Sequence, residues 1–260
     1  MKSKRLIVIS LDALGSTDFE MFSQLPNFKK FIDHAAFCRQ VRSVYPSLTY
    51  PAHTTIVTGR PPAEHGIVNN ILIQTERSSP DWFWQRKYIQ GTTLYDEALK
   101  KGMQVAALLW PVTAKSVILP CCTLIYPCSR KNRLIKNEIY DWLCAMKNDP
   151  DNGIAAIYSS KKAKELGADP ECTFMLEARR GFYFQNELDM GEIPEVQRAT
   201  HGFHPGRKDY QTVFMAVGPD IMPGVEIEEM SLMDEGPTMA EIMGLELPGA
   251  KGKVLREIFR

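Results

Sequence analysis

Thr49 lies at the start of a segment whose residues suit the binding of a phosphate-like anion. Pro51 fits the first turn of a helix and Gly59 fits its end, so residues 54–58 are predicted to be helical. At a helix N-terminus, free amide groups and the positive end of the helix dipole attract anions. The Thr49 hydroxyl there either caps the helix, which the spacing alone favours, or acts as a nucleophile. As a nucleophile it needs a cation or a base that holds it as an alkoxide.

Asp12 follows a continuous aliphatic run, residues 6–11, which has the pattern of a strand buried in a parallel sheet. The carboxyl ends of such strands open onto the crevice where α/β sheets bind ligands. Asp12 is therefore placed either for a metal ion or a substrate, or for the capping of a turn. The sequence gives these two roles equal weight.

The chain has five histidines, and their surroundings differ. His34 lies on a predicted amphipathic helix, where a histidine is usually a core residue. His53 and His65 lie close in sequence to the predicted anion site. His201 and His204 lie in a stretch rich in glycine and proline, which predicts a shaped loop, and neutral imidazole is a common ligand of zinc-like metals. This loop is therefore a candidate site segment.

Strand and helix patterns alternate along the N-terminal part of the chain. The predicted elements are a strand at 6–11, a helix at 26–36, a helix at 93–101 and a strand at 104–110. This alternation is typical of an α/β fold in which helices flank a sheet. The pattern fails at residues 120–133, where a double cysteine, two prolines and a polar run predict an irregular connection.

Regular patterns return after this connection. The predicted elements are a helix at 136–146, a strand at 154–158, a helix at 161–166, a strand at 212–217 and a helix at 237–244. Residues 173–184 predict either a pair of strands or one strand with a bulge around Gly181. The whole chain therefore favours the α/β class.

Composition and charge restrict the function classes. The chain has 260 residues, of which 44% are hydrophobic, enough to fill the core of one large α/β domain or two smaller ones. The 31 basic and 31 acidic side chains give a formal net charge of zero, which disfavours binding to nucleic acid through bulk electrostatics. The longest apolar runs are too short to cross a bilayer, and the N-terminus lacks the pattern of a signal peptide. We expect a cytoplasmic protein that binds neither nucleic acid nor membranes.

The spacings of the six cysteines do not match those of a structural zinc site, so free thiols are expected. The cysteines are Cys38, Cys121, Cys122, Cys128, Cys144 and Cys172. A soft-metal or redox role for the crowded group at 121–128 is the alternative.

Three long motifs give the sequence a family resemblance. They are IVISLD at 7–12, YPSLTYPAHTTIVTG at 45–59 and PAEHGIVNN at 62–70. Shorter matches lie at 109–113, 200–203 and 234–238. With these motifs the chain resembles the type I phosphodiesterase/nucleotide pyrophosphatase branch of the alkaline phosphatase superfamily. The resemblance covers roughly residues 5–115 and 150–260.

The resemblance implies a fold, a reaction and roles for particular residues. Members have an alkaline-phosphatase-like α/β sheet flanked by helices, and they hydrolyse phosphate diesters or pyrophosphates of small molecules with two divalent metal ions, usually zinc. By motif match, Thr49 would bridge the metals and be the nucleophile that forms a phospho-enzyme. Asp12 and His201 would be metal ligands. The amide of Asn70 would contact a phosphate oxygen.

The resemblance also implies more modest roles. His53 and His65 match motif residues that are expected to be structural supports, and His204 matches no ligand. Leu48 and Ala52 differ from the Lys and Asn that are common in nucleotide-cleaving relatives, so a nucleotide substrate is not implied.

The chain departs from the family pattern in its centre. The family's Asp with a His four residues later, and its Asp-His-Gly, are both missing. We therefore expect an internally shortened member, a single domain over residues 1–260 with a seam or deletion near 120–136. Asp209, Asp234 or a partner chain would have to supply the missing metal ligands.

Three hypotheses follow for the function. The first is a metal-dependent hydrolase of small-molecule phosphate esters. The second is a degenerate relative that binds phosphate-like anions without turnover, and the third is a product of gene deletion without activity of its own. A homodimer that covers exposed sheet edges is a further prediction.

Overall fold

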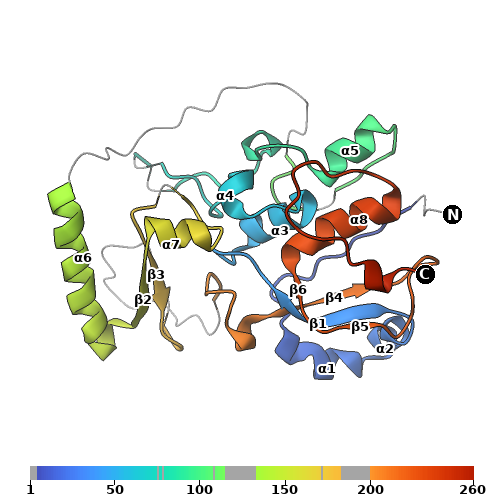
Figure 1. Cartoon of the computed structure of the whole chain (residues 1–260), viewed down its shortest axis with the longest axis horizontal. Helices are drawn as coiled ribbons and strands as arrows, with labels where there is room; N and C mark the ends of the chain where they lie inside the picture. Colours follow the sequence, from blue (N-terminus) through green and yellow to red (C-terminus); the bar gives the residue numbers. More distant parts are fainter. Residues whose placement is uncertain are drawn as a thin grey trace.

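The structure, a computed structural model, describes residues 5–74, 76–77, 79–107, 109–114, 133–170, 172–182 and 200–260. A larger part is built around a mixed sheet, and a smaller part is built on a two-stranded antiparallel sheet (Figure 1). The two sheets and the helices beside them confirm the predicted α/β class.

Strand β1, Ala36–Arg42, lies at the centre of the larger sheet. It pairs antiparallel with β4, Thr212–Ala216. It pairs in parallel with two short strands, β5, Glu226–Ile227, and β6, Met230–Ser231. The sheet is therefore mixed and not wholly parallel.

The side chains of β1 alternate between the two faces of this sheet, as the pleat of a strand requires. Ala36 and Cys38 point into the main core. Phe37 stacks on Phe19 on the opposite face, with 5.7 Å between the ring centroids. The register places Cys38 opposite Phe214 of β4 and then shifts within β1, which marks a bulge.

Helices cover both faces of the larger sheet (Figure 1). The short helices α1, Phe19–Ser23, and α2, Pro26–Ile32, lie on the face of Phe37. The opposite face carries α3, Thr49–Thr58, and α8, Glu235–Met243, which pack on each other. Helices α4, Pro62–His65, and α5, Leu94–Lys100, contact α3. Single turns of 3-10 helix are η1 Ser16–Asp18, η2 Arg86–Tyr88, η3 Pro150–Asn152, η4 Lys208–Tyr210, η5 Leu232–Asp234 and η6 Arg256–Ile258.

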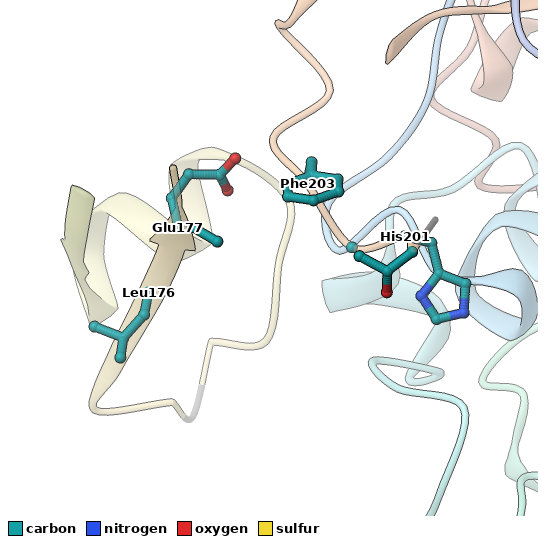
Figure 2. A pocket seen from close by; sticks show the side chains of 7 residues that line it. Leu176, Glu177, His201 and Phe203 are labelled. Carbon is teal, nitrogen blue, oxygen red and sulfur yellow. The ribbon is translucent and has the colours of Figure 1, made fainter. Parts of the chain in front are cut away.

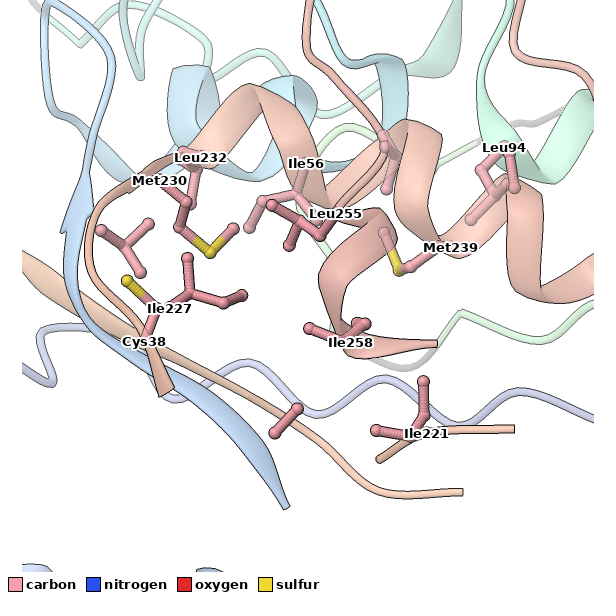
Figure 3. Packing of buried hydrophobic residues seen from close by; sticks show 14 of the residues in the cluster. Cys38, Ile56, Leu94, Ile221, Ile227, Met230, Leu232, Met239, Leu255 and Ile258 are labelled. Atoms are coloured by element: carbon pink, nitrogen blue, oxygen red, sulfur yellow. The ribbon is translucent and has the colours of Figure 1, made fainter. Parts of the chain in front are cut away.

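The main core lies between the larger sheet and helices α3 and α8 (Figure 3). Val41, Leu255 and Ile258 are fully buried in it. Burial of one such aliphatic side chain contributes roughly 1.5–3 kcal/mol to the free energy of unfolding. The other buried members are Ala36, Cys38, Ile56, Val57, Leu94, Ile221, Ile227, Met230, Leu232, Met239, Ala240 and Leu245.

The smaller part consists of strands β2, Ile154–Ser159, and β3, Phe174–Ala178, with helices α6, Arg133–Asn148, and α7, Ser160–Glu165. Helix α7 follows β2 directly and packs against both strands. Tyr45 of the larger part is buried against Ala163 and Ala168 of the smaller part. This apolar contact connects the smaller part to the segment that leads into α3.

Most of the predicted helices and strands after residue 90 are confirmed in type and place. Helix α5 begins with a capping box, in which the Thr93 hydroxyl accepts from the Asp96 amide and the Asp96 carboxyl accepts from the Thr93 amide. The confirmed predictions are the helices at 93–101, 136–146, 161–166 and 237–244 and the strands at 154–158 and 212–217. Of the strand structure predicted at 173–184, the structure contains β3, whereas residues 183 and 184 lie outside the described residues.

Two predicted strands are wrong. Residues 6–11 and the described residues of 104–110 form no strand. Ile7 and Ile9 expose 85% and 79% of their surface, and Leu109 is fully exposed. The apolar pattern was typical of a buried strand, but a strand forms only beside a partner, and the described residues place none next to either segment.

The helix predicted at 26–36 is too long. It ends at Ile32, and Ala36 already begins β1, which the sequence pattern missed. The bulge explains why, because it breaks the strict alternation of apolar and polar residues on which a strand prediction depends.

The predicted seam at 120–136 lies outside the described residues up to residue 132, so the single shortened domain stays a prediction. Cys121, Cys122 and Cys128 also lie outside them. Cys38, Cys144 and Cys172 are free thiols, as predicted. Among the described residues, the helices are too short or too polar to span a bilayer.

Candidate active site

Thr49 and Asp12 lie together at the N-terminus of α3. Thr49 is the first helical residue, and its hydroxyl donates to Oδ2 of Asp12 at 3.2 Å. Asp12 lies in a turn, in which its Oδ1 accepts from the amide of Ala13 at 3.1 Å. The Ala13 backbone has a φ of 61°, a left-handed conformation that is unfavourable for alanine. The two segments thus bring a hydroxyl and a carboxylate into contact although they are far apart in sequence.

The capping role that the spacing favoured for Thr49 is wrong. The N-cap of α3 is Leu48, whose side chain makes no capping hydrogen bond, and the Thr49 hydroxyl donates to Asp12 and does not accept from a helix amide. A hydroxyl in this arrangement has its proton directed at a carboxylate. Its oxygen lone pairs are then available to an electrophile.

Asn70 forms a hydrogen bond with the backbone of Tyr50, the residue after Thr49 in the first turn of α3. Asn70 is 8% exposed, and its Oδ1 accepts from the Tyr50 amide at 2.9 Å. Since an amide N–H needs an acceptor, the NH2 group of Asn70 is the end left to donate to another group. Pro51 has no amide N–H, so the first turn of α3 offers one backbone donor fewer to an anion.

His53 connects α3 to the N-terminal segment. Its Nδ1 lies 2.7 Å from the carbonyl oxygen of Thr49, and its Nε2 lies 3.0 Å from Oγ of Ser10. A carbonyl only accepts, so Nδ1 carries the proton in this contact. The ring also packs edge-to-face against Trp110, with centroids 5.0 Å apart. These contacts agree with the structural role predicted for His53.

His65 is fully buried behind the site. Its Nδ1 accepts from the Ile67 amide at 3.1 Å, and its Nε2 lies 3.0 Å from the Thr55 hydroxyl. Burial lowers the pKa of His65 to about 3, so the ring is neutral at physiological pH. Its nitrogens are occupied inside the protein, which agrees with the predicted role as a support.

His201 lies on the loop that passes the residues just before Thr49. The amide of Gly202 donates to the carbonyl oxygen of Ser47 at 3.1 Å, and the Ser47 hydroxyl donates to the carbonyl oxygen of Phe203 at 2.6 Å. The His201 side chain itself is exposed and has no hydrogen bond to Asp12 or Thr49. The structure therefore brings together Asp12, Thr49 and Asn70, with His201 on the adjoining loop.

A small cavity of about 120 Å³ lies beside this loop (Figure 2). Figure 2 shows Phe203 between Glu177 and His201, with the imidazole turned away from Glu177. The cavity is lined by Leu176, Glu177, Ala178, Thr200, His201, Gly202 and Phe203. Glu177 was not among the residues predicted from the sequence, although a lone carboxylate in the apolar strand FMLEA is a recognisable signal.

The donor set does not fit the two zinc ions that the family resemblance implies. The residues described by the structure contain no cluster of three or more His, Cys, Asp or Glu side chains that could hold a metal ion. A tight zinc site uses about three or four protein ligands, and Asp12, Thr49 and His201 are too few for two such sites.

The two acidic residues expected as replacement ligands are engaged elsewhere. Asp234 is buried, and its two carboxyl oxygens accept from the amides of Ser231 and Lys253. Asp209 is ion-paired with Arg207.

Comparisons with known proteins agree with the motifs. Residues 6–127 match the family described as Type I phosphodiesterase / nucleotide pyrophosphatase. The ectonucleotide pyrophosphatase/phosphodiesterase family member 3 of Rattus norvegicus is 31% identical over 118 residues, which cover 41% of this chain and 13% of that protein. The venom phosphodiesterase of Macrovipera lebetinus is 30% identical over 118 residues, again with 13% of that protein covered. The matched segment thus spans about an eighth of the length of these relatives.

The fold comparison extends over nearly the whole chain. Murine ectonucleotide pyrophosphatase / phosphodiesterase 5 superposes with a TM-score of 0.70 at 15% sequence identity, covering 96% of this chain and 98% of that chain. The human protein of the same name gives the same values. The α/β fold is thus alkaline-phosphatase-like, as the motifs predicted. The sequence match to the Type I phosphodiesterase / nucleotide pyrophosphatase family thus lies in residues 6–127, somewhat under half of the chain, and the fold match extends beyond this segment.

Proposed function

We propose that this protein hydrolyses phosphate diesters or pyrophosphates of small molecules, with Thr49 as the nucleophile. The hydrogen bond from the Thr49 hydroxyl to Asp12 at the N-terminus of α3 is the observation that carries the proposal. A carboxylate beside the hydroxyl accepts its proton, and the positive end of the helix dipole favours the negative charge of a bound phosphate.

In the proposed reaction, the Thr49 oxygen attacks phosphorus and forms a P–O bond while the bond from phosphorus to the leaving oxygen breaks. Asp12 accepts the Thr49 proton, and the leaving oxygen takes a proton from water. The hydroxide left from that water then attacks phosphorus, the bond from phosphorus to the Thr49 oxygen breaks, and Asp12 returns its proton to that oxygen, which restores the hydroxyl. The NH2 group of Asn70 stabilises the charge on a phosphate oxygen, because its carboxamide is fixed at the helix end through Tyr50.

Two features of relatives support this proposal. The matched family is named for phosphodiesterase and nucleotide pyrophosphatase activity. An inactive variant of murine ectonucleotide pyrophosphatase / phosphodiesterase 5, in which a threonine is replaced by alanine, has been solved in complex with AMP. Family members depend on metal ions, usually zinc, so a metal requirement is part of the proposal even though the described donor set does not account for it.

The second candidate function is phosphate binding without turnover. The small number of metal-ligating side chains near Thr49 favours it, because a two-metal centre supplies much of the rate in metal-dependent phosphoryl transfer. In that case Thr49 and Asn70 would form an anion site only.

One experiment separates the two functions. Metal content per chain is measured by plasma mass spectrometry on protein purified without chelator, together with hydrolysis of bis(p-nitrophenyl) phosphate with and without added Zn²⁺. We expect turnover that Thr49→Ala abolishes and that Thr17→Ala, at an exposed threonine outside the site, leaves unchanged. Metal near zero together with no turnover, but with measurable inorganic phosphate binding, would establish the second function.

The small phosphate ester substrate, the cytoplasmic location, the homodimer and the single domain over residues 1–260 belong to the same proposal. These four properties belong to the whole chain, whereas the sequence match covers residues 6–127 only. His201→Ala tests the proposed role of His201 as a metal ligand. Loss of bound metal in this variant would assign the imidazole as a ligand.

A further inference from the structure

Two segments that carry site residues run side by side. The hydrogen bonds between Ser47 and the loop at Gly202 and Phe203 connect the chain two residues before Thr49 to the chain just after His201. Any residue that fixes these two segments relative to each other also fixes His201 relative to Thr49.

Glu177 of β3 contacts both segments. Its Oε2 accepts from the Tyr45 hydroxyl at 2.8 Å, and the His204 amide lies 3.0 and 3.1 Å from its two carboxyl oxygens. Tyr45 precedes Thr49 by four residues, and His204 follows His201 by three. The carboxyl group therefore joins the segment of Thr49 to the segment of His201 from a third element of the fold.

The surroundings of Glu177 make this contact well defined. Glu177 is 6% exposed and Tyr45 is 1% exposed. Burial, followed by the neighbouring Glu177 carboxyl, raises the pKa of Tyr45 above its usual value, so the phenol keeps its proton and donates. The His204 ring packs on Tyr45 and Tyr158, with centroids 5.3 and 5.9 Å apart, which holds the loop on the same cluster.

Stability alone is a weak reason for a carboxylate at this place. Among the described ion pairs, none involves Glu177, and a buried carboxylate without a cation is usually less favourable than a well-packed apolar side chain. A carboxylate does offer two acceptor oxygens, and here they receive donors from two different segments. The two hydrogen bonds of Glu177 are therefore better explained by alignment of the Tyr45 and His204 segments than by packing.

We infer that Glu177 is a positioning residue that aligns the His201 loop with the Thr49 segment for the proposed reaction. This inference rests on the proposed function. Glu177 acts through the Tyr45 hydroxyl and the His204 amide and touches no substrate itself.

The first test measures the loop without reference to activity. Amide hydrogen exchange of His204 is followed by NMR in the wild type, Glu177→Ala and Glu177→Gln. We expect exchange at His204 to accelerate about tenfold or more in Glu177→Ala, because its acceptor is gone, and by less than about threefold in Glu177→Gln, which keeps one acceptor oxygen. Unchanged exchange in Glu177→Ala would overturn the inference.

The second test is a double-mutant cycle on kcat/KM for bis(p-nitrophenyl) phosphate. If Glu177 acts through the His201 loop, Glu177→Ala lowers kcat/KM by about tenfold in the wild-type background and by less than about twofold in His201→Ala. A merely structural role would give equal losses in both backgrounds and would contradict the inference. Glu165→Ala, at an exposed glutamate of α7, is the matched control.

Tyr45→Phe keeps the test valid if Glu177→Ala does not fold. It removes one donor to Glu177 and leaves the carboxyl in place. We therefore expect a smaller acceleration of His204 amide exchange and a smaller loss of kcat/KM than in Glu177→Ala. If the wild type neither hydrolyses the diester nor binds inorganic phosphate, the proposed function fails. The exchange experiment then still decides whether Glu177 holds the loop.

Discussion

At the scale of single residues, the candidate site is held by contacts of side chains with backbone groups. Asn70 accepts from the Tyr50 amide, and His53 donates to the Thr49 carbonyl. Both contacts fix the first turn of α3, where Thr49 faces Asp12. The orientation of the proposed nucleophile therefore depends on neighbours that do not take part in the chemistry.

Replacement of Asn70 separates its two functions. Asn70→Ala leaves the buried Tyr50 amide without an acceptor, and we expect a loss of about 1–3 kcal/mol in the free energy of unfolding. Asn70→Asp keeps an acceptor, so it should recover much of this stability, but it replaces the NH2 donor by a negative charge and should weaken inorganic phosphate binding at least as much as Asn70→Ala. Urea unfolding and phosphate titration measure the two effects. Equal phosphate affinity in all three proteins would argue against a role for Asn70 in anion binding.

His65 predicts a pH dependence of stability. Its pKa is about 3 in the folded protein and about 6.5 in the unfolded chain, so the unfolded chain takes up a proton as the pH falls below 6.5 while the folded protein does not. The free energy of unfolding should therefore decrease with falling pH between 6.5 and 3, by up to about 1.4 kcal/mol per pH unit from this group. Urea unfolding at pH 7 and pH 5 measures the decrease. In His65→Gln the decrease should be smaller by one proton's contribution, and an identical decrease in the variant would contradict the assignment.

At the scale of elements, α3 occupies the central place. Its N-terminus carries the candidate site, its buried residues Ile56 and Val57 belong to the main core, and it contacts α4, α5 and α8. Helix α3 ends at Gly59, which has a φ of 63° and receives the amides of Lys251 and Gly252 on its carbonyl. The site is thus attached to the C-terminal segment through the far end of the same helix.

Gly59→Ala should be more destabilising than the corresponding change at Gly102. Both glycines have a positive φ, 63° and 72°, but a Cβ at Gly59 would lie 2.8 Å from the Cβ of Ala250, whereas one at Gly102 would have open space. We expect about 1 kcal/mol from the left-handed backbone at Gly102 and about 1–3 kcal/mol more at Gly59 for the contact. Thermal or urea unfolding of both variants gives the difference. Equal losses would show that the contact relaxes freely.

At the scale of the whole molecule, the apolar segment at 6–11 and the described residues of the segment at 104–110 remain outside the sheets. Isolated apolar side chains on a surface are ordinary, but Ile7, Ile9 and Leu109 are all strongly exposed, and unpaired apolar segments favour association. This exposure is the physical basis for the predicted homodimer.

The paired substitution Ile7→Lys and Ile9→Lys tests this basis. We expect less self-association in sedimentation velocity, with a Tm that changes by no more than about 3 °C because exposed side chains contribute little to folding. Thr17→Lys adds charge at an exposed position outside the segment and should leave association unchanged. If the double variant associates as strongly as the wild type, the contact between two copies of the chain does not involve residues 6–11.

The fold was predictable from the sequence where local signals are strong. The capping box at Thr93, the glycine ends of α3 and α8 and the turn before β2 each act within a few residues. The site was predictable from motif spacing as a set of residues, although their roles stay predictions. Strand β1 and the contacts of Glu177 were not predictable, because a bulge and pairings across more than a hundred residues leave no local pattern.

By itself, the sequence determined most of the helices after residue 90, the family resemblance and the choice of Asp12, Thr49, Asn70 and His201 as candidates, because capping residues, periodicity and motifs are local properties. Only the tertiary structure decided that residues 6–11 form no strand, that Thr49 donates to Asp12 in place of capping α3, and that Glu177 joins two site segments. The physical reason is that strands and hydrogen bonds need partners, and the partners come from distant parts of the chain.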